Sequence, residues 1–319
     1  MSIGIVFVFI PPLLKLPGIL SVAALFIVVA SLGLLEVSSN ALAAQVFKTR
    51  TALYMNLMHF FYGFGAILSP RAAGAVASVM DWRHIYFFSI PLVLVFFIIT
   101  VFSRFPREDA AVSGKETGKT GFFTALKNPM VWFFSVVLGL MVAVEMCSVN
   151  WAGLYFQDVY NMDPKTRGAG FVSGYFIFFT ISRLVSGFGI EKIGYMRSLI
   201  IASIATFLIF LLGFVLGSNG YYVIPLTGIF IAIFWPTILA ISIGYFKDDA
   251  PLMSSAIIVI SGAFNALIQY LIGLTNRLAG PAWGYRSSLV YAVIIIAALV
   301  VLTKQLKYPY KPRIIGAGK

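Results

Sequence analysis

Long apolar stretches, separated by short polar turns, run through almost the whole chain. A helix needs about 20 apolar residues to cross the hydrocarbon core of a bilayer. Full spans are expected at residues 18–46, 52–79, 85–102, 130–155, 168–187, 198–217, 221–245, 253–278 and 287–306. An earlier apolar run is too short to cross, and Pro11 and Pro12 would break its last turn. The pattern predicts an all-α polytopic membrane protein with nine full spans and one partial span.

One long polar stretch divides the apolar stretches into two blocks. Residues 1–102 are predicted to form an incomplete N-terminal helical half, and residues 130–306 a C-terminal half of six helices. The polar stretch between them, residues 103–129, is expected to be a linker. Residues 307–319 are expected to form a tail.

A weak internal repeat relates the two blocks. Phe47-Lys48 recurs about 200 residues later as Phe246-Lys247, and such parallel repeats are typical of secondary transporters. With this period, roughly 70 residues are expected to be missing from the front, enough for two spans and part of a third. The expected fold is therefore a twelve-span protein that lacks its first two spans and part of the third.

Composition supports the membrane and excludes other classes. Hydrophobic residues make up 60% of the 319 residues and charged residues 11%, whereas soluble domains average about 45–50% and about 25%. Cys147 is the only cysteine and there are two histidines, so neither a disulfide framework nor a metal site is expected. No HExxH or Gly-x-Ser-x-Gly motif is present, and an enzyme is not expected.

The net charge of +12 could indicate nucleic acid as a partner. Most lysines and arginines outside the spans, however, fall in one set of alternate loops and in the C-terminal tail. Such loops face the cytoplasm in most membrane proteins. The linker and the C-terminus are therefore expected in the cytoplasm, and no nucleic-acid partner is predicted.

The turn after the fifth full span combines glycines with charged residues. These are Gly187, Glu191, Lys192, Gly194 and Arg197. Glycines allow close helix approach, and an acidic and a basic residue beside a helix end can hold neighbouring helices in one conformation. The segment resembles the cytoplasmic loop motif of the major facilitator superfamily. The resemblance implies a conformational latch that includes Arg183; an ordinary charged loop is the alternative.

Residues 31–74 resemble the fourth and fifth spans of the fucose/glucose:proton symporter branch of that superfamily. The matching residues are Gly33, Glu36, Asn40, Asn56, Leu57, Phe64, Gly65 and Ala66. Later segments containing Glu145, Trp151 and Pro236 are also similar to this branch. The resemblance covers nearly the whole chain and begins inside the third span of the family. It implies two helical halves that rock about a shared solute site.

Glu36 is the most informative of these residues. An ionisable group within an apolar span costs at least about 2.5 kcal/mol and usually faces a cavity or a partner. Asn40 follows one turn later and lies on the same helical face. The family resemblance implies that Glu36 is the proton-responsive group, and His59 is a candidate relay because its ordinary pKa lies near neutrality. A structural, hydrogen-bonded role is the alternative for both side chains.

Other polar residues are candidates for lining a solute cavity. Glu145 could accept hydrogen bonds from a polyhydroxylated solute, and Trp151 could offer a flat surface to the C–H groups of a sugar. Asn265 and Gln269 form an i, i+4 amide pair. Intramembrane amides also join helices, so packing is an equal alternative for this pair, and a helix-packing role is the alternative for Glu145. Asn40 completes the predicted substrate-binding set.

The resemblance implies proton-coupled uptake of a sugar or a sugar-like solute by alternating access. No cofactor is expected apart from the coupling proton. The protein is expected to be a monomer in the plasma membrane. Two alternatives remain open at this stage: an exporter of amphiphilic compounds with the same fold, and an inactive truncated fragment.

Overall fold

The structure of the protein is a computed structural model. This structure describes residues 18–20, 22–23, 26–27, 29–31, 51–81, 84–103 and 122–306. These residues form helices and turns without a strand, which confirms the predicted all-α class. The predicted partial span, the linker from residue 104 to 121 and the tail lie outside the described residues, so the total of nine full spans stays a prediction.

The chain divides into two compact units. The first comprises Met1–Tyr62 and Ala72–Gly114, and the second comprises Gly63–Arg71 and Lys115–Lys319. The helices that begin in the first block of the sequence are α3 (Thr51–Val79) and α4 (His84–Phe102). Most apolar side chains of α4 are exposed, as expected of a helix that meets lipid.

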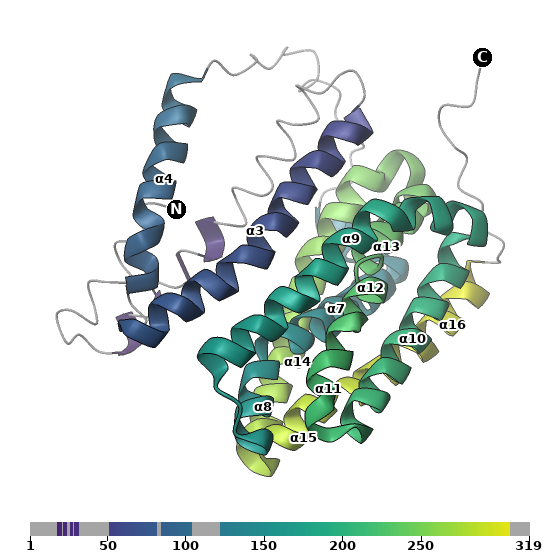
Figure 1. The fold of residues 1–319 in the computed structure, drawn as a ribbon. Helices are drawn as coiled ribbons and strands as arrows, with labels where there is room; N and C mark the ends of the chain where they lie inside the picture. Colours follow the sequence, from purple (N-terminus) through teal and green to yellow (C-terminus); the bar gives the residue numbers. More distant parts are fainter. Residues whose placement is uncertain are drawn as a thin grey trace. The chain divides into compact units, whose positions relative to one another are not determined.

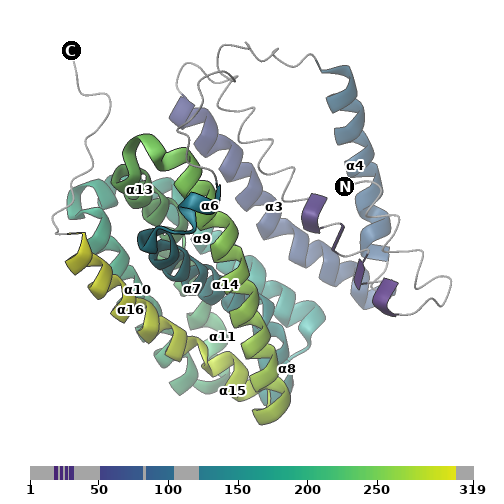
Figure 2. The same cartoon turned by 180° about the vertical axis from the view of Figure 1, so that it is seen from behind.

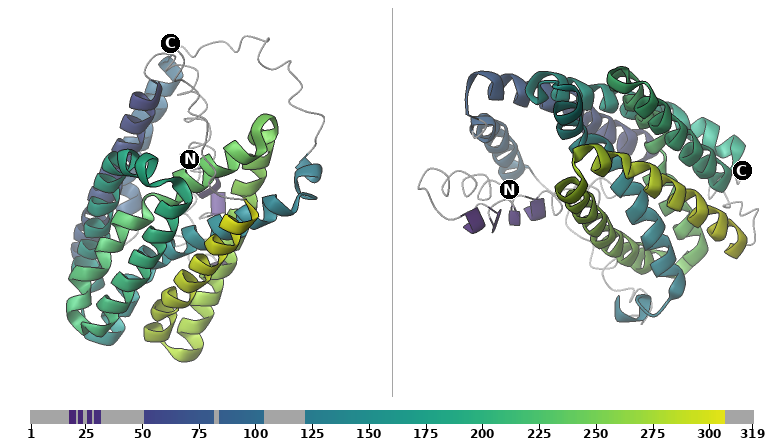
Figure 3. Two further views of the ribbon diagram at one scale, coloured as in Figure 1. Left: turned by 90° about the vertical axis from the view of Figure 1, so that its right-hand side faces the viewer. Right: turned by 90° about the horizontal axis from the view of Figure 1, so that it is seen from below.

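The second unit contains most of the described helices (Figure 1). They are α6 (Phe122–Ala125), α7 (Pro129–Asn150), α8 (Ala152–Tyr160), α9 (Ala169–Ile193), α10 (Tyr195–Val215), α11 (Gly220–Val223), α12 (Thr227–Ile231), α13 (Phe234–Phe246), α14 (Ala250–Ala279), α15 (Pro281–Arg286) and α16 (Ser288–Gln305). In the side view of Figure 3, the green and yellow helices of this unit run alongside one another.

Six segments of this unit are long and apolar enough to cross a membrane within the described part of the chain. They are Pro129–Asn150, Pro164–Ser186, Tyr195–Val215, Gly217–Phe246, Leu252–Ala279 and Pro281–Gln305. Each overlaps one of the six spans expected in the second block of the sequence.

The start of α7 follows from local chemistry. Asn128 precedes the helix in an extended conformation, and its side-chain oxygen accepts a hydrogen bond from the N–H of Met130 at 2.9 Å. Pro129 occupies the first helical turn, where its missing N–H costs nothing. The cap fixes the point at which α7 begins.

The helices α7 and α14 lie side by side at the centre of the unit (Figure 2). Gly139 is fully buried where they meet. A Cβ atom added at Gly139 would lie 2.6 Å from Cβ of Phe264 and 2.8 Å from the carbonyl oxygen of Ser261. The two backbones therefore approach through the absence of a side chain, as is common between membrane helices.

We expect Gly139→Ala to destabilise the second unit by about 1–3 kcal/mol, because the added methyl group would force α7 and α14 apart. Thermal unfolding of the purified protein measures this with a thiol-reactive fluorescent dye, since the only cysteine, Cys147, is fully buried. Gly262→Ala is the matched control, because a Cβ atom there meets nothing within 4 Å. Equal midpoints for both variants would contradict the close approach.

The segment Gly217–Phe246 crosses as an interrupted helix. Short 3-10 turns at Gly217–Asn219 and Ile224–Leu226 separate its first pieces, and α12 ends shortly before α13 begins. Pro225 and Pro236 cannot donate the backbone hydrogen bond that a continuous helix requires. Discontinuous helices at mid-depth are characteristic of transporter binding regions.

Candidate functional site

Three of the predicted solute-binding residues lie together between α7, α8 and α14. The indole Nε1 of Trp151 donates a hydrogen bond to Oε1 of Gln269 at 2.8 Å. Nε2 of Gln269 donates to the carbonyl oxygen of Ala143 at 3.0 Å and lies 3.5 Å from Oδ1 of Asn265. The three side chains therefore form one polar group, which we call the amide cluster: Trp151, Asn265 and Gln269.

The helices hold this cluster in place. Asn265 and Gln269 share a face of α14 because they are one helical turn apart. Trp151 marks the junction of α7 and α8, and its ring lies against Gly273, where a Cβ atom would be 3.4 Å from Cη2 of the indole. The hydrogen bonds of the cluster join α14 to α7 directly, which is the packing role that intramembrane amides often serve.

Glu145 lies in a second polar group, on the side of α7 that meets α9. Arg183 of α9 acts electrostatically on Glu145, and both act on Tyr175, also of α9. The guanidinium carbon of Arg183 lies 4.4 Å from the ring centre of Phe179, which stacks on Tyr175 at 5.7 Å between ring centres. We call Glu145, Tyr175, Phe179 and Arg183 the charged cluster.

The charged cluster contains polar groups without partners among the described residues. Tyr175 is fully buried, and no described residue forms a hydrogen bond with its hydroxyl. Nε of Arg183 is likewise buried, with no hydrogen-bond partner in the part of the chain that the structure describes. Buried polar groups are nearly always satisfied, so unpartnered ones call for an explanation. A hydroxyl and a guanidinium beside a carboxylate can hold a polar solute or respond to the protonation of the acid.

The two clusters lie on different sides of α7. Ala143, which accepts from Gln269, and Glu145 are two residues apart and so are rotated by about 200° around the helix axis. The structure thus brings together Trp151, Asn265 and Gln269. Glu145 lies near Arg183 instead. From the sequence, Glu145 was predicted to bind the solute and Arg183 to belong to the conformational latch.

The remaining predicted residues divide into two groups. Glu36 and Asn40 lie outside the described residues, and His59 lies in α3 with a side chain that the structure does not describe. Gly194 separates α9 from α10 with φ of 94°, a conformation that favours glycine. Lys192 and Arg197 on either side of it are exposed.

Arg183 lies on α9, well before the turn at Gly194. Its guanidinium faces Phe179, one turn toward the start of α9 and therefore away from Gly194. Gly187 is part of α9, and the side chain of Glu191 lies outside the description. The latch role of these residues stays a prediction.

The sequence did not single out Tyr175, Phe179 or Tyr285. Tyr175, Phe179 and Arg183 follow one another at four-residue intervals, a signal that could have indicated one shared face of α9. Tyr285 stacks on Tyr155 at 4.8 Å between ring centres and donates a hydrogen bond to the carbonyl oxygen of Ser148 at 3.2 Å. No local pattern connects residues so far apart in the chain.

Asp163 caps the π-helical turn Pro164–Gly168 that leads into α9. Its carboxylate accepts hydrogen bonds from the hydroxyl of Thr166 at 2.8 Å and from the N–H of Lys165 at 3.1 Å. These bonds, that of Thr166 above all, hold the pKa of Asp163 below its ordinary value of 3.8. Because the pKa falls on folding, the cap stabilises the protein above the ordinary pKa and is lost as the pH falls through the folded pKa.

We expect Asp163→Ala to lower the midpoint of thermal unfolding at neutral pH by a small amount, because the carboxylate is exposed. The difference from the unmodified protein should shrink as the pH falls below the ordinary pKa of 3.8, because the unfolded state is protonated first and the folded carboxylate only at a lower pH. Intrinsic tryptophan fluorescence, recorded during heating at several pH values, measures the midpoint of thermal unfolding of each protein. Asp163→Asn, which keeps an acceptor, is the control, and a difference that grows on acidification would contradict the cap.

Comparisons with known proteins agree with the helical arrangement. A family model described as Major Facilitator Superfamily matches residues 1–242. The curated protein "Bypass of stop codon protein 6" of Saccharomyces cerevisiae is 24% identical over 288 residues, which cover 78% of this chain and 57% of that protein. The chain therefore spans little more than half the length of this relative.

Two solved structures share the fold. The crystal structure of an Escherichia coli fucose:proton symporter, FucP, matches with a TM-score of 0.64 and 17% identity, over 95% of this chain and 80% of that chain. A second structure of FucP, a transporter in the outward conformation, matches with a TM-score of 0.61 and 18% identity over the same shares. Identities this low support the similarity of fold alone.

Proposed function

Since the chain belongs to the Major Facilitator Superfamily, we propose that it is a secondary active transporter which takes up a sugar or a sugar-like solute together with a proton. It is a multi-pass membrane protein with six candidate spans in its second unit. We further propose that it acts as a monomer in the plasma membrane, with its linker and C-terminus in the cytoplasm.

The amide cluster is the observation that carries this proposal. It places an indole and two carboxamides between central helices of the second unit, where polar groups within apolar spans are costly and often functional. Carboxamides can both donate hydrogen bonds to and accept them from the hydroxyl groups of a solute, and the indole offers an apolar face. The solute would compete with the bonds that now join α7 to α14.

A proton is the proposed coupling ion. Glu36 is proposed to bind the proton on one side of the membrane and to release it on the other, with His59 as a relay. Desolvation favours the neutral form of a carboxyl group and solvation the charged form, so alternating exposure supplies the necessary change in affinity. The charged cluster gives the second unit a carboxylate of its own, and Glu145 is proposed to contact the solute.

Transport by the purified full chain in liposomes tests the proposal. Uptake of a panel of radiolabelled sugars is compared with uptake of lipophilic cations, with and without an inward proton gradient. We expect a sugar or a related polyol to accumulate only with the gradient. Export of lipophilic cations with no sugar uptake would overturn the assignment in favour of an exporter of amphiphiles, and failure to transport either class would also contradict it.

Gln269→Ala and Trp151→Phe then test the amide cluster. Both remove the hydrogen bond between these two side chains, and Gln269→Ala also removes the bond to Ala143. We expect each to raise the KM for the solute, and Thr275→Val on the same helix, whose hydroxyl donates only to Leu271 of its own helix, to leave it unchanged.

A further inference from the structure

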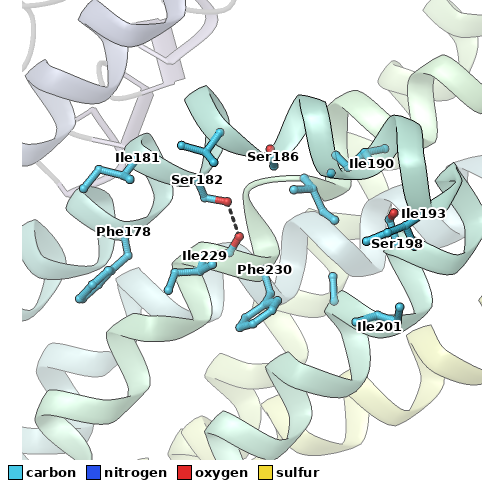
Figure 4. A pocket seen from close by; sticks show the side chains of 14 residues that line it. Phe178, Ile181, Ser182, Ser186, Ile190, Ile193, Ser198, Ile201, Ile229 and Phe230 are labelled. Atoms are coloured by element: carbon cyan, nitrogen blue, oxygen red, sulfur yellow. Dashed lines mark hydrogen bonds between the residues drawn. The ribbon is translucent and has the colours of Figure 1, made fainter.

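An apolar groove opens between α9, α10 and α12 (Figure 4). It has a volume of about 420 Å³, within the usual range of ligand sites. Phe178 and Ile181 of α9 line one end, together with Ile229 and Phe230 of the α12 span. The wall between α9 and α12 is held by the hydroxyl of Ser182, which donates to the carbonyl oxygen of Ile229.

One end of the apolar groove carries a buried serine hydroxyl. The end near the α9–α10 turn is lined by Ile193 and Ser198, and Figure 4 shows these two side by side, away from Phe178. Ser198 is only 5% exposed, and its hydroxyl has no hydrogen-bond partner among the described residues. A buried hydroxyl without a partner at one end of an apolar groove indicates a ligand with two parts. Its apolar tail would lie in the groove, and a hydrogen-bond acceptor at the end of that tail would lie beside the hydroxyl.

Basic residues adjoin this polar end. Lys192 precedes Ile193, Arg197 precedes Ser198, and both side chains are exposed. The segment from 191 to 197 contains one acidic residue, Glu191, against these two. The turn therefore carries a net positive charge between the candidate spans Pro164–Ser186 and Tyr195–Val215.

We propose that this groove binds one anionic glycerophospholipid of the bilayer leaflet that meets the α9–α10 turn. One acyl chain lies between α9, α10 and α12, the ester carbonyl accepts a hydrogen bond from Ser198, and the phosphate lies between Lys192 and Arg197. The apolar walls, the unsatisfied hydroxyl and the two cations follow one another in the order of the parts of such a lipid.

Lipid retention by the full chain in detergent tests the headgroup. The delipidated protein is titrated with dioleoyl phosphatidylglycerol or dioleoyl phosphatidylcholine, and the affinity of the first bound lipid is measured by native mass spectrometry. We expect a preference for phosphatidylglycerol and a loss of about fivefold in its affinity for each of Lys192→Gln and Arg197→Gln. Lys304→Gln, which removes an exposed charge from the end of α16, is the control and should have no effect.

A groove-filling variant tests the acyl site. Gly189 lines the groove, and a Cβ atom there meets nothing within 4 Å, so the side chain of Gly189→Leu has room to enter the groove. We expect it to weaken both lipids at least tenfold, while Gly262→Leu on α14 does not. Unchanged phosphatidylglycerol binding in Gly189→Leu, or equal affinity for the two lipids, would overturn the proposal. A dimer that Gly189→Leu abolishes would do the same, because the occupant would then be a second copy.

Discussion

Glu36→Gln is expected to abolish accumulation of the solute against its gradient while sparing counterflow. Glutamine keeps the size and hydrogen-bonding capacity of the side chain but cannot carry a proton. At one proton per solute, a gradient of one pH unit supports about tenfold accumulation, and the variant should only equilibrate the solute. Counterflow exchanges labelled for unlabelled solute without net proton movement, so it should continue.

Two comparisons separate this coupling role from a loss of structure. Glu36→Asp keeps a titratable group and should retain part of the accumulation. Asn40→Ala, one turn away, should raise the KM without uncoupling transport from the proton. Accumulation that survives Glu36→Gln would exclude this carboxyl group as the coupling site.

Arg183→Gln should destabilise the second unit more than the simultaneous change of Arg183 and Glu145 to glutamine. Arg183 supplies the positive charge that acts on the carboxylate of Glu145. The single change therefore leaves this carboxylate with no compensating charge within the span. We expect a loss of about 2–3 kcal/mol, because breaking a buried ion pair in direct contact costs roughly 3–5 kcal/mol and these groups form no contact within 4 Å.

The buried Cys147 again provides the measurement, since a thiol-reactive dye reports the opening of α7 on heating. Glu145→Gln completes the cycle, and the double variant should recover at least half of the loss. Arg167→Gln is the matched control: Arg167 is exposed and packs over Tyr221 with 5.8 Å between the guanidinium carbon and the ring centre. Additive effects of Arg183→Gln and Glu145→Gln would show that the two residues do not interact.

The spans of the second unit could be predicted because a bilayer imposes a length and a composition on each helix. The apolar stretch predicted at 198–217, for example, overlaps the span Tyr195–Val215. The interruptions of the span Gly217–Phe246 were only implicit in Pro225 and Pro236. The hydropathy of a segment predicts that it spans the membrane, but it does not predict where the helix within that segment loses a backbone hydrogen bond.

The candidate site was predictable only in part. Polar residues are easily recognised within an apolar stretch of sequence, and Glu145, Trp151, Asn265 and Gln269 were predicted in this way. Their grouping depends on how each helix is rotated about its axis, and that rotation is set by packing. Gly139 lets α14 approach one side of α7, while α9 presents Arg183 to the other.

The sequence alone determined that the protein is an all-α membrane protein, because each apolar stretch must satisfy its backbone polar groups within a helix. It also determined which polar residues carry an energetic cost that calls for a function. Only the tertiary structure decided that Trp151 pairs with Gln269, that Glu145 lies within electrostatic range of Arg183, and that a groove lies between α9, α10 and α12. These features depend on contacts between residues distant in the chain, which no local periodicity records.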